Sequence, residues 1–305
     1  MSEPSTIPVI DLAALAGASP ERAAALRALA FACRTSGCFY LRNHGAPEAV
    51  VANAVRLFGA FFDLPNEMRM TVAIAPGETS GYEPLGRATG EFNDSFNYVG
   101  GLDLFDAATL PRPNANKWPA APVGLREGTE AYMGAMHAVG RRVLAAIAES
   151  LGEPPDAFEP LIAPAVGGSL RARRYPPQRL SSGAVGARAH TDGLAFSLIV
   201  QNDVVGLESF TPDRGFVKLA PIPDTIVCQL GSLFGRLTND RYAPNLHRII
   251  NDDTERERRS LVYWFPLRLD AVIQCLPSCA APDDPPRYPP ITFERYLAEW
   301  IAGLE

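Results

Sequence analysis

The spacing of apolar residues changes along the chain from a helical to a strand-like period. In the first half, apolar residues recur three or four positions apart at about 20–35, 47–62 and 127–151, which predicts three amphipathic helices. From residue 169 onward the apolar runs are short, rich in β-branched and aromatic residues, and separated by Pro, Gly and Asp. That pattern predicts strands joined by tight turns.

Several element ends carry their own signals. Ser19 before Pro20 is typical of a helix start, and Gly37 is typical of a helix end. A strand is predicted at 170–175, where two prolines follow it, and a hairpin is predicted at 206–219. Shorter strands and a final helix at about 289–304 complete the expected elements.

Composition and charge narrow the class of protein. The chain has 305 residues, of which 47% are hydrophobic and 20% charged, enough for one large β domain or two modest ones. Its net charge of −6 and pI near 5.4 argue against a nucleic-acid partner. No apolar run approaches the roughly 18 residues of a membrane span. The segment Met1–Ser5 lacks a basic-then-apolar signal pattern, so we expect a soluble, cytoplasmic protein.

The five cysteines are odd in number and scattered along the chain. Cys275 and Cys279 could pair, but in a cytoplasmic protein we expect reduced thiols. None of the cysteines shows the C-x-x-C spacing of a zinc site.

The segment His190-Thr191-Asp192 is the first candidate for metal chemistry. In a strand, residues i and i+2 face the same side, so His190 and Asp192 can direct an imidazole and a carboxylate to one point. His247 follows Asp192 by 55 residues and supplies a third candidate ligand. Two histidines and one carboxylate suit Fe(II) and leave coordination positions open. A His-x-Asp segment alone is a weak signal, because such tripeptides arise by chance.

A second motif follows His247-Arg248. Arg258-Arg259-Ser260 leads directly into the apolar run 261–265, which predicts a strand. In that strand Arg258 and Ser260 would share a face. Arg258 could instead be a surface charge, because the segment 252–259 also has the composition of a charged surface loop.

Together these segments resemble the isopenicillin N synthase-like family of Fe(II)/2-oxoglutarate-dependent dioxygenases. That family carries H-x-D, then H-R about 55 residues later, then R-x-S before an apolar strand. The resemblance implies an α+β fold, mainly β, with a double-stranded β-helix (jelly-roll) core and an N-terminal helical and strand region packed around it. We expect the N-terminal region at 1–165, the dioxygenase core at 166–275 and a C-terminal extension with a helix at 276–305.

The resemblance also implies roles for particular residues. His190, Asp192 and His247 would be the catalytic iron ligands, and 2-oxoglutarate and O₂ would take the remaining positions on Fe(II). Arg258 and Ser260 would bind the far carboxylate of 2-oxoglutarate. Tyr175 occupies the Tyr-Pro-Pro position, where the family's tyrosine often reaches the co-substrate.

Other positions are left open. Arg256 or Arg259 could replace Arg258, because the apolar run does not fix the first residue of the strand. Arg173 stands where relatives often have Asn, and it could bind an anionic substrate or be a surface charge. The segment Phe96–Tyr98 could line the substrate pocket or only pack against its neighbours.

Of two further histidines, His44 is expected to be structural and His137 to be a packing or surface residue. His44 follows a predicted strand, and His137 lies on the long helix predicted at 127–151. Neither has the spacing of the better candidate ligands.

The implied activity is an oxidoreductase reaction. We expect hydroxylation, desaturation or cyclisation of a small organic molecule, with release of succinate and CO₂, by a protein that is a monomer. One alternative is an Fe(II)/O₂ oxidase of the same fold that does not use 2-oxoglutarate. Another is a jelly-roll binding protein without catalysis.

Overall fold

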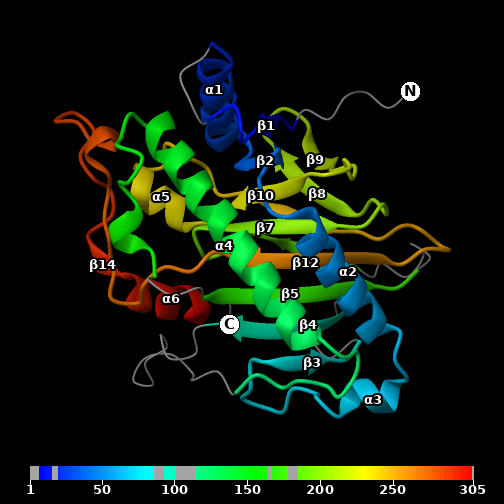
Figure 1. Cartoon of the computed structure of the whole chain (residues 1–305). Helices are drawn as coiled ribbons and strands as arrows, with labels where there is room; N and C mark the ends of the chain where they lie inside the picture. Colours follow the sequence, from blue (N-terminus) through cyan, green and yellow to red (C-terminus); the bar gives the residue numbers. More distant parts are fainter. Residues whose placement is uncertain are drawn as a thin grey trace.

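Two sheets facing each other form the centre of the fold, and helices cover the outside of the larger one (Figure 1). The computed structural model describes residues 7–15, 20–85, 93–100, 115–163, 167–177 and 185–303. In spatial order, the strands of the large sheet are β1 (Val9–Asp11), β2 (Cys38–Arg42), β10 (Ile226–Leu230), β7 (Phe196–Gln201), β12 (Arg258–Trp264), β5 (Gly168–Tyr175), β4 (Asp94–Gly100) and β3 (Gly81–Glu83).

The small sheet is formed by the second half of the chain. Its strands in spatial order are β6 (Ala187–His190), β11 (His247–Ile249), β8 (Leu207–Thr211) and β9 (Gly215–Lys218). All of its pairings are antiparallel, and β8 and β9 form the predicted hairpin. This two-sheet arrangement agrees with the expected jelly-roll core. A separate short pair joins β13 (Val272–Ile273) to β14 (Ile291–Thr292).

The three long helices lie close to their predicted positions. They are α1 (Pro20–Thr35), α2 (Glu48–Phe62) and α4 (Leu125–Ser150). Figure 1 shows α2 and α4 crossing one face of the large sheet. The shorter helical segments are α3 (Asn66–Met70), η2 (Glu159–Leu161), α5 (Leu233–Thr238), η4 (Pro277–Cys279) and α6 (Phe293–Ala302). Within the described residues, no helix is both long enough and apolar enough to cross a bilayer.

Two details differ from the sequence prediction. Helix α5 was not expected, and it ends where Asn239 adopts a left-handed backbone conformation with φ of 54°. The final helix begins at Phe293 rather than near 289, because residues 291–292 pair with β13 and Thr292 accepts a hydrogen bond from the backbone N–H of Arg295. The division of the chain at 165 and 275 stays a prediction.

The strands of the large sheet divide their side chains between two environments. Along β5, Leu170 and Ala172 belong to the core beneath the helices, whereas Tyr175 belongs to a second apolar cluster between the sheets. Along β12, Leu261 faces the helices and Val262 faces the space between the sheets. This alternation follows from the pleat of a strand, and it decides which residues reach the space between the sheets.

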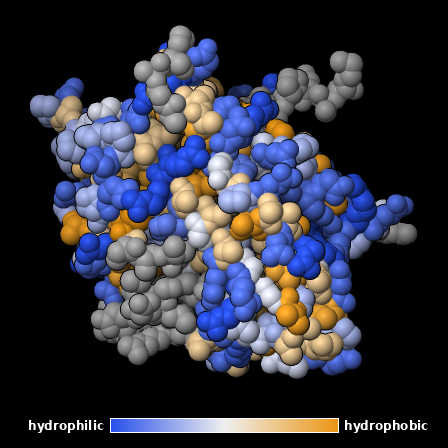
Figure 2. All heavy atoms as spheres, in the orientation of Figure 1, coloured by the Kyte–Doolittle hydropathy of each residue, from blue (hydrophilic) through white to orange (hydrophobic). Residues whose placement is uncertain are grey.

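The outer surface seen from the helical side is mixed in character. Figure 2 shows hydrophilic side chains interspersed with smaller apolar patches on this face. The five cysteines form no disulfide in this structure, and four of them are buried.

Gly140 allows α4 to approach the large sheet closely. A Cβ at this position would lie 2.1 Å from a ring carbon of Phe265. That ring cannot move away easily, because it is stacked against His137 and Phe196 at centroid distances of 5.1 and 5.0 Å. Gly134, on the same helix, has open space where its Cβ would be.

We therefore expect opposite effects from two Gly→Ala changes in α4. Gly140→Ala should lower the free energy of unfolding by about 1–3 kcal/mol, because the added methyl overpacks the core. Gly134→Ala should raise it by about 0.5–1 kcal/mol, because Ala loses less backbone entropy in a helix. Urea unfolding curves for the two variants measure both effects. Equal stability of the variants would contradict the close packing at Gly140.

Candidate active site

A pocket with an empty volume of about 390 Å³, including its open mouth, lies between the two sheets. Strand residues of both sheets and Asp192, just after β6, line it. Its wall holds the candidate metal ligands, the candidate 2-oxoglutarate-binding residues, two further polar side chains (Arg173 and Gln229) and a set of apolar side chains. The lining residues are Arg173, Tyr175, Ala187, His190, Asp192, Ile199, Leu207, Gln229, His247, Ile249, Arg258, Ser260, Val262 and Trp264.

The pairing of β6 with β11 brings the two candidate histidine ligands together. His190 and His247 are directly opposite each other in this antiparallel pair, and their ring centroids are 4.3 Å apart. Asp192 follows two residues after His190, and its Oδ1 lies 3.8 Å from His190 Nε2. One potential ligand atom from each of the three residues lies within 4.8 Å of the others. Among the described residues, this is the group of His, Cys, Asp and Glu side chains close enough to hold a metal ion.

The backbone orients both imidazoles. His190 Nδ1 lies 2.7 Å from the carbonyl oxygen of Arg188, and His247 Nδ1 lies 3.2 Å from that of Asn245. A neutral imidazole that donates from Nδ1 keeps an unprotonated Nε2, the form that binds a metal. Asn245 is itself buried and donates to Ser209 Oγ at 2.6 Å, so the residue that orients His247 is also fixed.

The protonation of His247 suits the same role. Burial lowers the pKa of this imidazole, the nearby Asp192 carboxylate opposes that effect, and His190 adds to it. A lowered pKa keeps the imidazole neutral at physiological pH, as metal ligation requires. The donor set, its burial and its ring orientation therefore fit a divalent metal such as Fe(II).

The loop that carries Asp192 is tied to two neighbouring segments. The backbone N–H of Ser232 donates to the carbonyl oxygen of Asp192 at 2.8 Å, and the hydroxyls of Thr191 and Ser232 are 3.1 Å apart. On its other side, Gly193 lies against Trp300 of α6, where a Cβ would come 2.2 Å from the indole ring. These contacts hold the carboxylate in register with the two imidazoles.

Arg258 brings a positive charge into the pocket with 1% of its surface exposed. Its Nη1 donates to Ser260 Oγ at 3.2 Å and its Nη2 donates to Gln201 Oε1 at 3.0 Å. Its Cζ lies 5.2 Å from the ring centroid of Tyr175, the residue opposite it on β5. Burial lowers the pKa of Arg258, but an arginine starts so high that it stays charged.

This buried cation lacks an anionic partner within the described part of the chain. Arg258 makes no ion pair there, and its buried Nε makes no hydrogen bond. The buried Nε2 of Gln201 is also without a hydrogen-bond partner. Burying an unpaired charge is costly, so the site fits a ligand that carries a carboxylate. A carboxylate could accept hydrogen bonds from the guanidinium and from Ser260.

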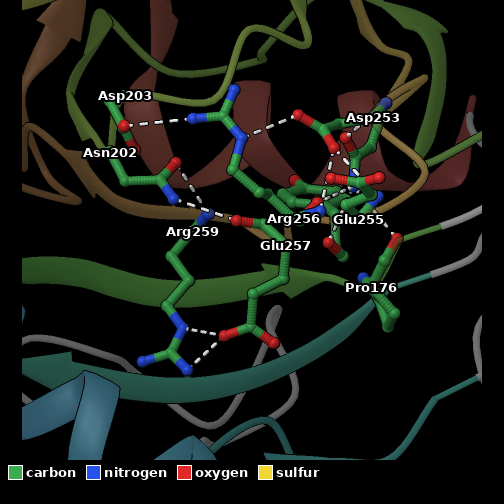
Figure 3. Close-up of polar contacts among 10 residues, drawn as sticks. Pro176, Asn202, Asp203, Asp253, Glu255, Arg256, Glu257 and Arg259 are labelled. Atoms are coloured by element: carbon green, nitrogen blue, oxygen red, sulfur yellow. Dashed lines mark hydrogen bonds and ion pairs between the residues drawn. The ribbon is translucent and has the colours of Figure 1, made fainter.

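The two other arginines considered for this role are not part of the pocket wall. Figure 3 shows the polar contacts that Arg256 and Arg259 make instead. Arg256 is largely exposed and bridges Asp203 and Asp253. Arg259 points to the opposite side of β12, where it contacts Asp63 at 2.5 Å and also Glu257. The pleat of β12 therefore places Arg258 and Ser260 together in the pocket.

Three other residues that the sequence analysis considered lie outside the pocket wall. His137 is buried against Phe265, and His44 accepts a hydrogen bond from the backbone N–H of Ala46 outside the metal-ligand group, so both agree with a structural role. Phe96 packs on Phe61, with ring centroids 4.9 Å apart, in the core beneath the helices rather than in the pocket.

The rest of the Phe96–Tyr98 segment offers little to the pocket. Asn97 is buried but is not part of the pocket wall, and the side chain of Tyr98 lies outside the described residues.

Sequence reasoning missed three pocket-associated residues. Gln201 contacts Arg258, while Gln229 and Trp264 line the pocket. The sequence does contain a signal for Gln201. This polar residue directly follows the apolar run 196–200, and in a strand it would share a face with Ile199.

Comparisons with known proteins agree with this geometry. Residues 7–121 match the family model of the non-haem dioxygenase in morphine synthesis N-terminal region, and residues 167–266 match that of the 2OG-Fe(II) oxygenase superfamily. Among curated proteins, the chain is 32% identical to Protein DMR6-LIKE OXYGENASE 1 of Arabidopsis thaliana, covering 89% of this chain and 76% of the relative. It is 29% identical to the 2-oxoglutarate-Fe(II) type oxidoreductase hxnY of Emericella nidulans, covering 95% and 88%.

Solved structures show the same fold. A crystal structure of JOX2 in complex with 2OG, Fe and JA superposes with a TM-score of 0.81 at 26% identity, covering 95% of this chain and 83% of that one. A putative 2OG-Fe(II) oxygenase family protein from Caulobacter crescentus, at 24% identity, has a TM-score of 0.84 and covers 99% and 100%.

Fold, site and similarity together define a non-haem iron oxygenase. The chain belongs to the isopenicillin N synthase-like family of Fe(II)- and 2-oxoglutarate-dependent oxygenases. The predicted family, jelly-roll fold, oxidoreductase activity and use of Fe(II), 2-oxoglutarate and O₂ are thereby confirmed. The alternatives of a 2-oxoglutarate-independent oxidase and of a non-catalytic binding protein are not favoured by any observation.

We expect each of the changes His190→Ala, Asp192→Ala and His247→Ala to abolish tight Fe(II) binding, because two ligands no longer complete the facial set. Anaerobic Fe(II) titration followed by desalting and metal analysis measures the bound stoichiometry. His44→Gln is a matched control, since His44 lies outside the group, and it should bind Fe(II) like the wild type. Full Fe(II) occupancy in any of the three alanine variants would contradict this ligand set.

Proposed function

We propose that His190, Asp192 and His247 hold Fe(II), and that Arg258, Ser260 and Tyr175 hold the far carboxylate of 2-oxoglutarate. The observation that carries the proposal is one pocket that contains both a two-histidine, one-carboxylate group and a buried arginine that has no ion-pair partner in the part of the chain that the structure describes. The first group matches the ligands that Fe(II) prefers. The arginine matches a carboxylate in charge and in two-point geometry.

When bound, Fe(II), 2-oxoglutarate and O₂ supply the oxidising chemistry, in which 2-oxoglutarate becomes succinate and CO₂ while a small organic molecule is hydroxylated, desaturated or cyclised. The protein contributes three things. The ligand side chains fix one face of the metal, Arg258 fixes the far end of the co-substrate, and the apolar wall keeps bulk water away from the reacting centre. That wall is formed by Ala187, Ile199, Leu207, Ile249, Val262 and Trp264.

Arg258 is positioned before any ligand binds. Gln201 and Ser260 hold its two terminal nitrogens, and the Tyr175 ring lies beneath the guanidinium. Gly206 gives it room, because a Cβ at that position would lie 2.7 Å from Arg258 Cδ. A preorganised cation binds a carboxylate with a smaller loss of side-chain entropy.

The cellular setting is part of the proposal. The free thiols support a reducing compartment such as the cytoplasm. The acidic net charge supports a small-molecule partner rather than a nucleic acid.

The function is tested by following both products in one assay. The purified protein is incubated with Fe(II), ascorbate, 2-oxoglutarate and a panel of small organic acids, amides and phenolics in air. We expect succinate release to rise above the uncoupled rate with at least one compound, in step with oxidation of that compound. Oxidation without succinate would instead favour the 2-oxoglutarate-independent oxidase.

We expect Arg258→Ala to raise the 2-oxoglutarate concentration needed for half-maximal succinate release by about tenfold or more. The lost charge-assisted pair is worth about 1.5–3 kcal/mol, and 1.4 kcal/mol corresponds to tenfold. Arg256→Ala is a matched control that removes a surface arginine from the adjoining loop, and its requirement should stay within twofold of wild type. If Arg256→Ala raises the 2-oxoglutarate requirement and Arg258→Ala does not, Arg256 is the residue that binds the carboxylate.

A further inference from the structure

We propose that Arg173 binds a carboxylate of the primary substrate, so that this oxygenase acts on a small organic acid. This inference rests on the proposed function, because it assumes that Fe(II) and 2-oxoglutarate occupy the same pocket. It goes further by naming the chemical class of the substrate and the residue that selects it.

The position of Arg173 on β5 directs it into the pocket. It lies two residues before Tyr175 and is opposite Ser260 of β12, so all three side chains share the inner face of the large sheet. The pocket wall includes Arg173 together with Arg258 and Ser260. The next residue, Arg174, faces the opposite side and donates to the carbonyl oxygen of Phe62 in α2.

The surroundings of Arg173 leave its charge without a counter-ion among the described residues. Its side chain has one hydrogen bond there, a long contact of 3.5 Å to Asn93 Oδ1. Its strand neighbours on either side, Ser95 and Ser260, are neutral. The carboxylate of Glu83 contacts Ser95 from β3, which is two strand spacings, or about 10 Å, from β5.

Two positively charged side chains, Arg173 and Arg258, therefore line the same pocket. Arg173 is half-buried, whereas Arg258 is fully buried. The charge of Arg173 contributes to lowering the pKa of Arg258, after the larger effect of burial, which agrees with their proximity. Like charges at such a site destabilise the empty protein, and an anion between or beside them would relieve that repulsion.

The charges of the loaded site indicate which molecule supplies that anion. A ferrous ion and Arg258 together carry three positive charges. The Asp192 carboxylate and the two carboxylates of 2-oxoglutarate carry three negative charges, so these groups neutralise one another. Arg173 adds a fourth positive charge that neither the metal site nor the co-substrate balances. A substrate with one carboxylate would balance it, whereas a neutral substrate would leave the half-buried Arg173 without a counter-ion among the described residues.

The test measures binding in a complex that cannot turn over. The wild-type protein is loaded with Mn(II) and N-oxalylglycine, an unreactive analogue of 2-oxoglutarate, and titrated calorimetrically with matched acids and amides. The pairs are phenylacetate with phenylacetamide, cinnamate with cinnamamide, and indole-3-acetate with indole-3-acetamide. We expect at least one acid to bind about tenfold or more tightly than its amide, because a buried charge-assisted pair exceeds 1.4 kcal/mol.

Two variants separate Arg173 from a general effect of charge. Arg173→Gln should weaken binding of the preferred acid by about tenfold or more and leave the amide within twofold, which removes the preference. Arg174→Gln removes the same charge from the adjacent residue on the opposite face and should keep the preference. Circular dichroism spectra and unfolding midpoints of both variants show that the fold is retained.

Each other outcome has a distinct meaning. If wild-type protein fails to bind N-oxalylglycine in the presence of Mn(II), the proposed function is wrong and the inference goes with it. If the analogue binds but no acid is preferred over its amide, the inference alone is overturned. If Arg173→Gln weakens binding of N-oxalylglycine rather than binding of the acid, Arg173 binds the co-substrate. The inference that the substrate is an acid is then overturned.

Discussion

The antiparallel pairing of β6 with β11 is the contact on which the rest of the proposed chemistry depends. It joins two segments that are 57 positions apart at His190 and His247, and it brings their imidazoles together with ring centroids 4.3 Å apart. Asp192 follows His190 by two residues, so its carboxylate lies close to the two imidazoles. A shift of this pairing by one residue would turn one imidazole away from the other, because neighbouring side chains in a strand alternate between faces.

The pleat of the large sheet separates structural from functional side chains. Along β5 and β12, one set of residues fills the core under α2 and α4, and the other set forms the wall of the pocket. The core residues are held by packing, so the strands that carry the arginines are rigid. That rigidity keeps a buried guanidinium oriented toward a ligand instead of folding back onto the surface.

Sequence reasoning predicted the parts of the site that a local strand period or the motif spacing of a known family indicates. Strand periodicity alone relates His190 to Asp192, and family spacing relates them to His247. The choice among Arg256, Arg258 and Arg259 needed the structure, because the charged run does not show where β12 begins. Pairing with β5, about 80 residues earlier in the chain, sets that register.

Other features were hidden for similar reasons. Gln201 meets Arg258 only because β7 and β12 are neighbours in the sheet, and the assignment of Phe96 to the core depends on which face of β4 meets the helices. Helix α5 is so short that its six residues show no clear helical period. The long helices, by contrast, each repeat their apolar spacing over several turns, and they were predicted within about two residues at each end.

The contact between Gly193 and Trp300 links helix α6 to the candidate metal site. The indole of the last helix rests directly against the loop that presents Asp192, at a position where even a methyl group would collide. Anything that lifts α6 from the body of the protein would remove the support behind that carboxylate. Helix α6 therefore supports the loop that carries this candidate iron ligand, and we expect that loss of its packing would also weaken metal retention.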